Sequence, residues 1–341
     1  MKIDNKVRAI VLFSGGLDSI LACKVLQEQG IDVIALQCIT PFFNYQIKED
    51  EEAWAKQIED KYNIATMVLD ITDDYLKMLK KPPHGFGRYF NPCIDCKILM
   101  IKKALSIMED LGASFIATGE VIGQRPMSQR RDTLRIIERD SGAEGLLLRP
   151  LCAKNLKPTL IEEQGLVDRS RLLALSGRGR KEQMALARKY SIIDYPSPAG
   201  GCVLADPILS ERFRILLSMW DDVDANDLLL AQTGRHFLLE GESWFVVGRN
   251  QAENSKLVDL VRTGDLVLQY KAGPGPVGVM RRYMNPPPVQ QAASLLLRYC
   301  KVPAGQLAEV VVKDSKHQEI QIVNAERFPA EDVDSLMLNK V

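Results

Sequence analysis

The sequence predicts an α/β fold with a doubly wound parallel sheet, followed by a smaller α+β domain. Three observations support this prediction. Residues 7–13 form an unbroken apolar run, which is typical of a strand covered on both faces. Apolar residues recur at helical spacing over 17–30, where Gly30 is a good helix stop. Strand and helix patterns then alternate up to residue 119, and right-handed crossovers between such strands build a parallel sheet.

The remaining elements follow in chain order. A Pro/Gly-rich loop is expected at 194–202 and a domain boundary near 207–220, which gives domains 1–210 and 211–341. Further strands are expected at 32–40, 65–71 and 113–119, and helices at 50–63, 93–112, 159–167 and 179–190. Extended runs are expected at 133–139 and 145–151, a hairpin at 235–241 and 243–250, and a strand at 265–271.

Composition bounds the class of protein. The chain has 341 residues, which suggests two domains, and its 44 basic and 44 acidic side chains give no global preference for a polyanionic partner. Any nucleic-acid contact must then come from local patches. The first apolar run is too short for a signal peptide, and no window reaches the roughly 18 apolar residues of a membrane span. We therefore expect a soluble, cytoplasmic protein with no membrane partner.

The first turn of the predicted sheet, S-G-G-L-D-S, is the strongest candidate site. Gly15 and Gly16 let the backbone approach a ligand, and the following helix N-terminus offers N–H groups to an anion. Ser14 and Ser19 add hydroxyl groups, while Asp18 could hold Mg²⁺ or orient the loop. The turn is neither G-x-x-x-x-G-K-[ST] nor G-x-G-x-x-G, and it lacks a lysine for a γ-phosphate. Released pyrophosphate therefore suits it better than phosphoryl transfer.

A polar stretch, 115–129, follows the fourth predicted strand. Gly119 stands at the carboxyl end of that strand, where ligands of doubly wound sheets bind. An ordinary polar loop is the alternative interpretation. The side chains that could contact ATP or a base are Glu120, Gln124, Ser128 and Gln129.

Two of the seven cysteines, Cys93 and Cys96, stand one turn apart at a predicted helix start, where the dipole lowers a thiol pKa. Cys202 follows a flexible Pro-Ala-Gly-Gly loop. Three thiolates would leave an iron–sulfur cluster with one iron open. Cysteine-only sulfur chemistry, a redox pair, zinc and a chance spacing without a site are the alternatives. Zinc needs a fourth ligand, and of the three histidines only His84 is near in sequence. Core positions are expected for Cys23, Cys38, Cys152 and Cys300.

These motifs occur in one order over about residues 7–205. S-G-G-x-D-S, C-x-x-C, T-G-E-x-x-G-Q-x-x-S-Q and L-L-L-R-P-L together resemble the PP-loop domain of tRNA 4-thiouridine synthetases, of the adenine nucleotide alpha hydrolase-like fold. The segment N-P-C-I-D-C-K also resembles tRNA-specific 2-thiouridylases. The glycine loop is common to the PP-loop ATP pyrophosphatases, which form an adenylated intermediate from ATP.

The resemblance implies an ATP-dependent tRNA uridine sulfurtransferase that forms AMP and pyrophosphate. Cys93, Cys96 and Cys202 would be catalytic, as ligands of a [4Fe-4S] cluster or as persulfide carriers, and Asp18 would act with Mg²⁺. The expected partners are tRNA or another RNA and a sulfur donor, either sulfide or a persulfide carrier protein; a second copy of the chain, in a homodimer, is a further candidate. The residues implied in ATP binding are Ser14, Gly15, Gly16, Asp18, Ser19, Gly119 and Gln124.

The sequence departs from that family at several points. The glycine loop begins at Ser14, which leaves no room for an N-terminal THUMP module, no rhodanese domain is evident, and S-Q-R-R-D-T-L carries extra charges. Residues 234–257 and 265–280 are similar to the RNA-binding NFACT-R domain of ribosome quality control factors. A solvated face is the alternative for its basic residues. Candidate phosphate contacts are Arg125, Arg130, Arg131, Arg135, Arg178, Arg180 and Lys181, and in the second domain Arg235, Arg249, Lys256 and Lys271.

Other functions share these features. A PP-loop adenylating ligase or amidotransferase would use the same nucleotide loop without needing three cysteines. The same chemistry could thiolate a small metabolite. A non-catalytic RNA-binding protein with a nucleotide site would form no AMP or pyrophosphate.

Overall fold

The computed structural model describes residues 6–196 and 202–338, and the chain divides into two compact units, Met1–Ala205 and Asp206–Val341. Most of the loop predicted at 194–202 lies outside the described residues. The division falls at the start of a helix. This start is capped by the Asp206 carboxylate, which accepts the backbone N–H groups of Ile208 and Leu209 at 2.9 and 2.8 Å. The sequence placed the boundary at 210/211, inside this helix, α8 (Pro207–Met219).

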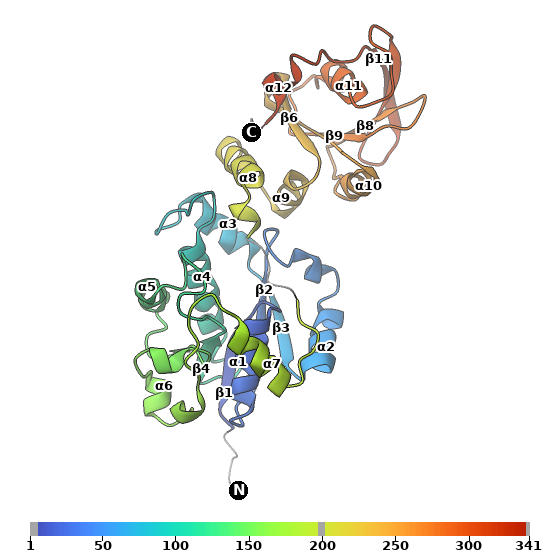
Figure 1. Cartoon of the computed structure of the whole chain (residues 1–341). Helices are drawn as coiled ribbons and strands as arrows, with labels where there is room; N and C mark the ends of the chain where they lie inside the picture. The colour runs from blue at the N-terminus through green and yellow to red at the C-terminus, as the bar shows by residue number, and fades with distance from the viewer. Residues whose placement is uncertain (1–5, 197–201, 339–341) are drawn as a thin grey trace. The chain divides into compact units, whose positions relative to one another are not determined.

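A five-stranded parallel sheet forms the centre of the N-terminal unit (Figure 1). Its spatial order is β3-β2-β1-β4-β5, so the order reverses between β1 and β4, the position where ligands of doubly wound sheets bind at the carboxyl ends of the strands. The first four strands lie within two residues of the predicted runs because those runs are apolar enough to be covered on both faces, and β5 occupies the middle of the run predicted at 145–151. They are β1 (Arg8–Phe13), β2 (Asp32–Ile39), β3 (Ala65–Asp70), β4 (Phe115–Thr118) and β5 (Leu147–Leu148).

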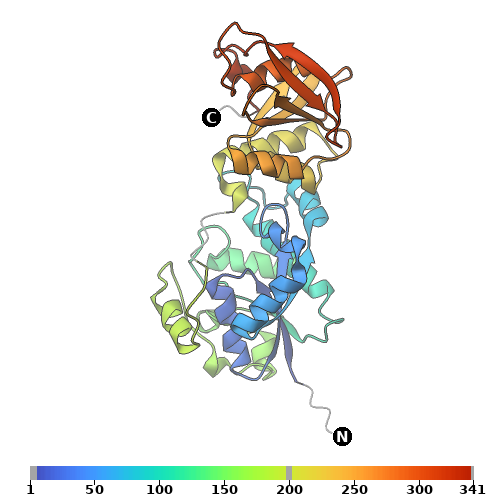
Figure 2. The same cartoon turned by 90° about the vertical axis from the view of Figure 1, so that its right-hand side faces the viewer.

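Helices cover both faces of this sheet, which confirms the doubly wound fold. Ala9, Val11 and Phe13 of β1 share one buried core with side chains of α1, α2, α6 and α7. Helix α4 packs against β1 and β4 from the other side, next to α3 and α5 (Figures 1 and 2). The helices are α1 (Leu17–Gln27), α2 (Glu51–Tyr62), α3 (Thr72–Lys80), α4 (Cys93–Ser106), α5 (Arg131–Ser141), α6 (Leu160–Glu163) and α7 (Lys181–Lys189).

One predicted element has the wrong secondary structure. Residues 133–139 were expected to be extended, but they lie inside α5. Leu134, Ile137 and Ser141 are buried at helical spacing, and Gly142 ends the helix in the left-handed conformation, with φ of +76°. Taken alone, the run T-L-R-I-I-E-R is compatible with a strand. It forms a helix because its buried side chains, spaced three and four residues apart, pack on one face. Helix α3 was not predicted.

The C-terminal unit is built on a six-stranded sheet whose pairings are all antiparallel, in the order β11-β10-β8-β9-β7-β6. The predicted hairpin is confirmed as β6 paired with β7, and the predicted strand at 265–271 as β8. Helix α11 packs against the sheet over a separate core. The strands are β6 (Arg235–Leu239), β7 (Ser243–Val247), β8 (Leu266–Tyr270), β9 (Val277–Arg281), β10 (Ala308–Lys313) and β11 (Glu319–Ala325), and the other helices are α9 (Ala225–Ala231), α10 (Gln251–Asp259), α11 (Val289–Leu297) and α12 (Val333–Leu336).

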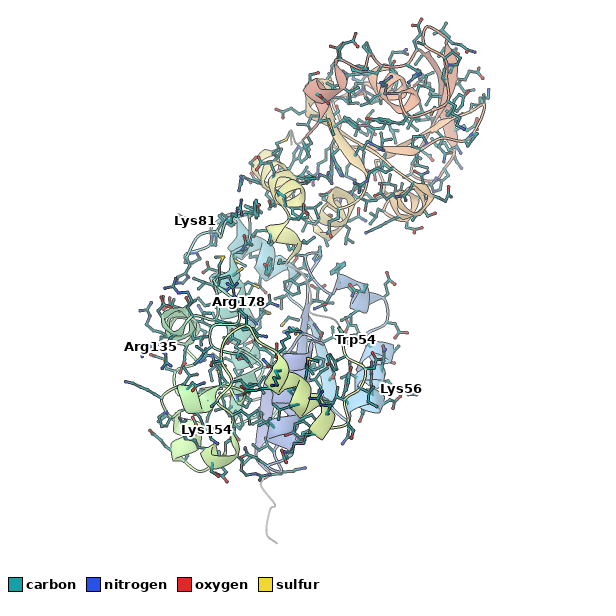
Figure 3. All side chains as sticks on the ribbon, viewed as in Figure 1. Trp54, Lys56, Lys81, Arg135, Lys154 and Arg178 are labelled. Carbon is teal, nitrogen blue, oxygen red and sulfur yellow. The ribbon has the colours of Figure 1, made fainter. Side chains whose placement is uncertain are left out.

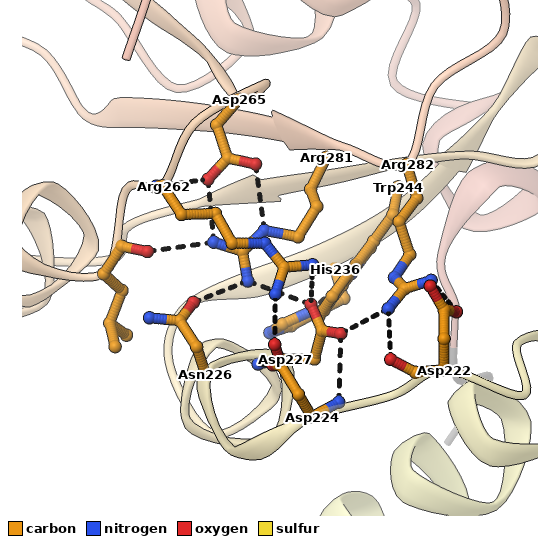
Figure 4. Close-up of polar contacts among 11 residues, drawn as sticks. Asp222, Asp224, Asn226, Asp227, His236, Trp244, Arg262, Asp265, Arg281 and Arg282 are labelled. Carbon is orange, nitrogen blue, oxygen red and sulfur yellow. Dashed lines mark hydrogen bonds and ion pairs between the residues drawn. The ribbon is translucent and has the colours of Figure 1, made fainter. Parts of the chain in front are cut away.

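A buried ionic network ties α9 to this sheet (Figure 4). Arg281, at the end of β9, is 2% exposed and uses all five of its N–H donors. They reach both oxygens of Asp265, one oxygen of Asp227, the side chain of Asn226 and the backbone oxygen of Leu260, at 2.7 to 3.0 Å. The smaller α+β domain is therefore a packed unit with a fully paired interior charge. In the part of the chain that the structure describes, no helix combines the length and the apolar character needed to cross a membrane.

Candidate functional site

The turn between β1 and α1 leaves backbone N–H groups open. Gly15 has φ of +73°, a conformation that glycine adopts without strain. Gly16 precedes the helix, and no side chain of the described residues caps this helix start. The Ser19 hydroxyl donates to the backbone oxygen of Gly16 at 2.7 Å, and the Ser14 N–H donates to Ser19 Oγ at 3.3 Å. The uncapped N-terminus of an 11-residue helix can hold an anion such as a phosphate chain.

Asp18, in the first turn of α1, has one buried oxygen without a hydrogen-bond partner among the described residues. Its Oδ2 accepts from the Gln124 amide at 2.9 Å and lies 3.8 Å from the Arg180 guanidinium, whereas Oδ1 is unpaired. Burying an unpaired carboxylate oxygen is costly, and a cation would satisfy it. Since Mg²⁺ prefers oxygen ligands, Asp18 fits the metal role expected of it. Gln124 orients this carboxylate.

Gly119 lets two backbone segments touch. A Cβ at this position would lie 2.6 Å from the carbonyl carbon and oxygen of Asp18 and 2.7 Å from the amide nitrogen of Ser19. No neighbour can move out of the way, because the atoms belong to the backbone of α1. The end of β4 is therefore pressed against the start of α1, and the role of Gly119 is to permit this contact.

Sequence reasoning missed Trp54, which lies on α2 (Figure 3). Its indole ring comes within 3.7 Å of the Cβ position of Gly15, so it packs beside the glycine turn. Its buried Nε1 has no partner among the described residues. The only signal in the sequence was a tryptophan on an amphipathic helix, which usually means core packing.

The polar residues of the 119–129 stretch do not all point to a ligand. Glu120 is 2% exposed and pairs with Arg149 at 3.1 Å, and Arg149 also reaches Glu138 at 3.0 Å. Arg149 belongs to L-L-L-R-P-L, so two of the motifs meet in one buried ion pair. Ser128 and Gln129 are buried as well. Through its Oε2, Glu120 fixes the loop that carries Gln124, while its buried Oε1 has no partner among the described residues.

The three expected cysteines all influence Tyr75 of α3. Cys93 and Cys96 occupy the first turn of α4, and Cys96 forms a hydrogen bond with Tyr75. The pKa of the buried Tyr75 hydroxyl is raised by burial and also by the charges of Cys96, Cys202 and Cys93, so all three thiols lie within electrostatic range of it. The side-chain amide of Asn91 donates to Cys93 Sγ at 3.2 Å. The fold thus brings together thiols from distant parts of the unit.

The expected lowering of thiol pKa by the helix start is wrong for Cys96. Burial raises the pKa of its thiol to about 12, because desolvation of the thiolate outweighs the nearby positive charge of Lys97. Burial also raises the pKa of Cys202, while a hydrogen bond with the backbone of Leu204 and the charge of Arg125 have smaller opposing effects. Within 6–196 and 202–338, no group of three His, Cys, Asp or Glu side chains is arranged to hold a metal ion. The predicted core positions of Cys23, Cys38, Cys152 and Cys300 are confirmed.

The predicted phosphate contacts differ in their surroundings. In the N-terminal unit Arg135 and Arg178 are exposed (Figure 3). In the C-terminal unit Arg249 pairs with Glu253 at 2.6 Å, and Lys271 pairs with Glu309 at 2.8 Å. Among the other predicted contacts, Arg130 pairs with Asp132 and Arg235 stacks over the ring of Tyr299. Lys256 is exposed.

The motif G-R-N-x-x-E-N-x-x-L builds a strand-to-helix junction. Asn250 caps α10 by accepting the Glu253 N–H at 3.0 Å, and Glu253 accepts the backbone N–H of Arg249 at 2.8 Å. Asn254 accepts the Val277 N–H at 3.0 Å and fills the space where a side chain at Gly248 would stand. Each polar residue of this motif thus has a local structural partner.

Together, the fold and the site define an α/β nucleotide-binding type of unit with a cysteine cluster, joined to a mainly antiparallel unit. Residues 5–162 match the family model of the thiamine biosynthesis protein (ThiI), and residues 234–337 match the NFACT protein RNA binding domain. The predicted resemblance of the two regions, to thiouridine synthetase-type PP-loop proteins and to NFACT-R domains, is confirmed.

Curated relatives agree with the first match. The tRNA-specific 2-thiouridylase MnmA of Clostridium botulinum is 32% identical over 127 residues, which cover 34% of this chain and 35% of the relative. The MnmA of Listeria monocytogenes serotype 4a is 24% identical over 287 residues, covering 75% and 72%. The chain thus spans about a third of the length of the first of these relatives.

Two solved structures show partial overlap. A 4-thiouridine synthetase–RNA complex with bound ATP is 21% identical, with 55% of this chain and 41% of that chain covered and a TM-score of 0.38. The U34-tRNA thiolase NcsA from Methanococcus maripaludis, with its [4Fe-4S] cluster, is 17% identical, with 59% and 63% covered and a TM-score of 0.33.

Proposed function

We propose that this chain is an ATP-dependent sulfurtransferase that replaces a carbonyl oxygen of a uridine in tRNA with sulfur. The observation that carries the proposal is that Cys93, Cys96 and Cys202 all lie within electrostatic range of Tyr75, with Cys96 hydrogen-bonded to it, in the unit that also holds the glycine turn. The match to the ThiI family model and the similarity to 2-thiouridylases support it. A nucleotide site alone would not need three thiols.

Adenylation is the first step of this mechanism. The C2 or C4 carbonyl oxygen of the uridine attacks the α-phosphorus of ATP as N3 loses its proton, and the bond to pyrophosphate breaks. The open N–H groups after Gly15 and Gly16 would hold the phosphate chain while charge develops on the leaving group. Asp18 would hold Mg²⁺, which supplies further charge neutralisation. Gln124 keeps Asp18 in position.

Sulfur transfer is the second step. A sulfur nucleophile attacks the activated ring carbon, AMP leaves with the former carbonyl oxygen, and the thiocarbonyl regains the N3 proton. Three thiols are a donor set that suits a [4Fe-4S] cluster with one iron left free for sulfide, and the Asn91 amide donates to one of these sulfurs. In the described residues the three are not close enough together to hold a metal ion, so they would have to approach one another when the cluster binds. In the persulfide alternative, a second cysteine attacks the S–S bond, which releases the product and leaves a disulfide.

The C-terminal unit would hold the RNA. Its match to the NFACT protein RNA binding domain supports this role. Lys256 is exposed, whereas Arg249 and Lys271 are paired with carboxylates, so any phosphate contact of these two competes with an ion pair.

Anaerobic purification followed by an assay with ATP and unfractionated tRNA tests this function. We expect bound iron and sulfide, formation of AMP and pyrophosphate, and thiouridine in digested tRNA by mass spectrometry. Cys93→Ala should abolish thiouridine, while Cys300→Ala, a buried cysteine of the other unit, serves as the matched control.

Each alternative gives a distinct result. Cys93→Ala with intact product formation would indicate an adenylating ligase or amidotransferase. Thiolation of a small molecule and not of tRNA would indicate that the substrate is a small metabolite. Absence of AMP and pyrophosphate with RNA bound would indicate a non-catalytic RNA-binding protein.

A further inference from the structure

We infer that residues 81–92, here called the aromatic loop, bind an unpaired base of the RNA substrate by stacking it on Phe86. This inference rests on the proposed function, because it names where the RNA lies at that site. The loop runs K-P-P-H-G-F-G-R-Y-F-N-P and leads directly into Cys93. None of the motifs used above includes Phe86.

Phe86 presents an aromatic surface to solvent. It is 39% exposed, and it is the single phenylalanine among the large apolar side chains that the described residues expose. Its ring stacks on Phe90, which is 5% exposed, with ring centroids 4.5 Å apart and planes 21° apart. A buried ring therefore supports the exposed one in a fixed orientation. Stacking platforms of this kind bind single-stranded nucleic acid without regard to sequence.

The charge of the aromatic loop suits a polyanion. Lys81 and Arg88 are both exposed, and the loop contains no acidic residue. Arg88 lies over the ring of Tyr89, 5.3 Å from its centroid, so its guanidinium is held close to the aromatic surface. Positive side chains beside an aromatic platform can neutralise the phosphates on either side of a stacked base. The basic charge excludes a basic partner surface, and the exposed ring beside it favours a nucleic-acid base over an acidic protein patch.

Contacts at its C-terminal end fix the loop beside the cysteines. The Asn91 side-chain amide donates to Cys93 Sγ at 3.2 Å and to Met127 Sδ at 3.5 Å, while its oxygen accepts the Tyr89 N–H at 3.2 Å. A Cβ on Gly87 would lie 2.5 Å from the Met127 sulfur, so the loop rests directly on the 119–129 stretch. The stacking surface is thus tied to both the cysteine pair and the loop of Gln124.

A second attachment holds the N-terminal part of the loop. The His84 N–H donates to Asp95 at 3.0 Å, and the two ring nitrogens of His84 lie 2.8 Å from Asp95 and 2.9 Å from Asp140. Helices α4 and α5 therefore both anchor the loop. With both ends attached, little ordering is needed when a base binds, which favours recognition.

Binding of RNA to the full-length protein tests the inference. The probes are unfractionated tRNA and a single-stranded oligouridylate with one 2-aminopurine, whose fluorescence is quenched by stacking. We expect Phe86→Ala to raise Kd on the order of tenfold and to remove quenching, because one base stack is lost. Phe86→Tyr, which keeps an aromatic ring, should bind within about twofold of wild type. Leu160→Ala, another exposed apolar position in the same unit, is the matched control.

A charge variant adds an independent measurement. Arg88→Ala should lower the slope of log Kd against log salt by about one, the contribution of one lost phosphate contact. Lys56→Ala, on α2 and well apart from Lys81 in Figure 3, should leave the slope unchanged.

The results separate this inference from the proposed function. If wild type thiolates tRNA and Phe86→Ala does so with unchanged KM and RNA affinity, the aromatic loop does not bind the substrate. Loss of binding to a sulfur-carrier protein with RNA affinity intact would overturn the inference as well. If wild type forms no thiouridine but shows Phe86-dependent quenching, the base-stacking site stands and the sulfurtransferase function does not.

Discussion

Two carboxylates, the half-buried Asp18 in the N-terminal unit and the buried Asp227 in the C-terminal unit, are in opposite situations. Both oxygens of Asp227 accept hydrogen bonds from arginine side chains, including Arg281 at 3.0 Å and Arg262 at 2.9 Å. Asp18 Oδ1 has no partner among the described residues. A complete set of partners indicates a structural charge, whereas a missing partner beside the uncapped start of α1 suits a ligand. Glu120 Oε1 also lacks a partner in the described part of the chain, but the other oxygen of that carboxylate is paired with Arg149. The two carboxylates should therefore respond to mutation in different measurements.

Removing Arg281 should have the largest effect on stability. Arg281→Ala leaves Asp227 and Asp265 buried without their main cation, which costs about 3–5 kcal/mol of unfolding free energy. Urea unfolding followed by tryptophan fluorescence measures this, since Trp244 is fully buried in the same unit. Arg214→Ala, in an exposed pair with Glu211, should cost below about 1 kcal/mol. Equal losses in the two variants would contradict a structural role for the network.

Removing the charge of Asp18 should affect activity and spare stability. Asp18→Asn keeps one oxygen for the Gln124 bond and removes the unpaired anion, so the unfolding free energy should stay within about 0.5 kcal/mol of wild type or rise. Pyrophosphate release with ATP and RNA should fall on the order of a hundredfold, because charge compensation at the leaving group is lost. A variant that loses stability while keeping pyrophosphate release would place Asp18 with Asp227, as a structural carboxylate.

Gly119→Ala tests whether contact between two backbones sets the site geometry. A methyl group 2.6 Å from the Asp18 carbonyl must push β4 and α1 apart, and overpacking of this kind costs about 1–3 kcal/mol. ATP affinity, measured by isothermal titration, should fall together with stability, because the displaced atoms belong to the phosphate-binding turn. Gly179→Ala is the matched control, because no atom of the described residues lies near the Cβ position of Gly179. Gly112→Ala is unsuitable, because the φ of Gly112 is +60° and an alanine there would be strained. Unchanged affinity for ATP would show that the turn tolerates the displacement.

The sequence predicts the strands and the glycine turn well because both depend on local pattern. Continuous apolar runs give β1 and β2 almost to the residue, and Gly15 adopts the positive φ that its turn needs. Contacts between side chains far apart in the sequence could not be predicted from local patterns. The pairing of Glu120 with Arg149, the missing partner of Asp18 and the approach of Trp54 to Gly15 each join segments far apart in sequence. Helix α5 was predicted wrongly as an extended run because its local sequence is compatible with both the strand and the helix periodicity.

His84 extends the comparison to a charge that is paired but able to titrate. Its ring lies between Asp95 and Asp140, and Arg139 in turn pairs with Asp140. The hydrogen bond to Asp95 and both carboxylate charges raise the pKa of His84. A raised pKa in the folded state stabilises the protein fully below the unfolded value of about 6.5, and this contribution is lost as the pH rises through the folded pKa.

His84→Gln should therefore cost about 1 kcal/mol of unfolding free energy at pH 6 and clearly less at pH 9. Urea unfolding of both proteins at the two pH values measures the difference. A gap that does not change with pH would mean that His84 acts as a neutral hydrogen-bonding group. Its charge would then play no part in holding the aromatic loop, and the two carboxylates would have to be satisfied by other donors, as Asp227 is satisfied by its arginines.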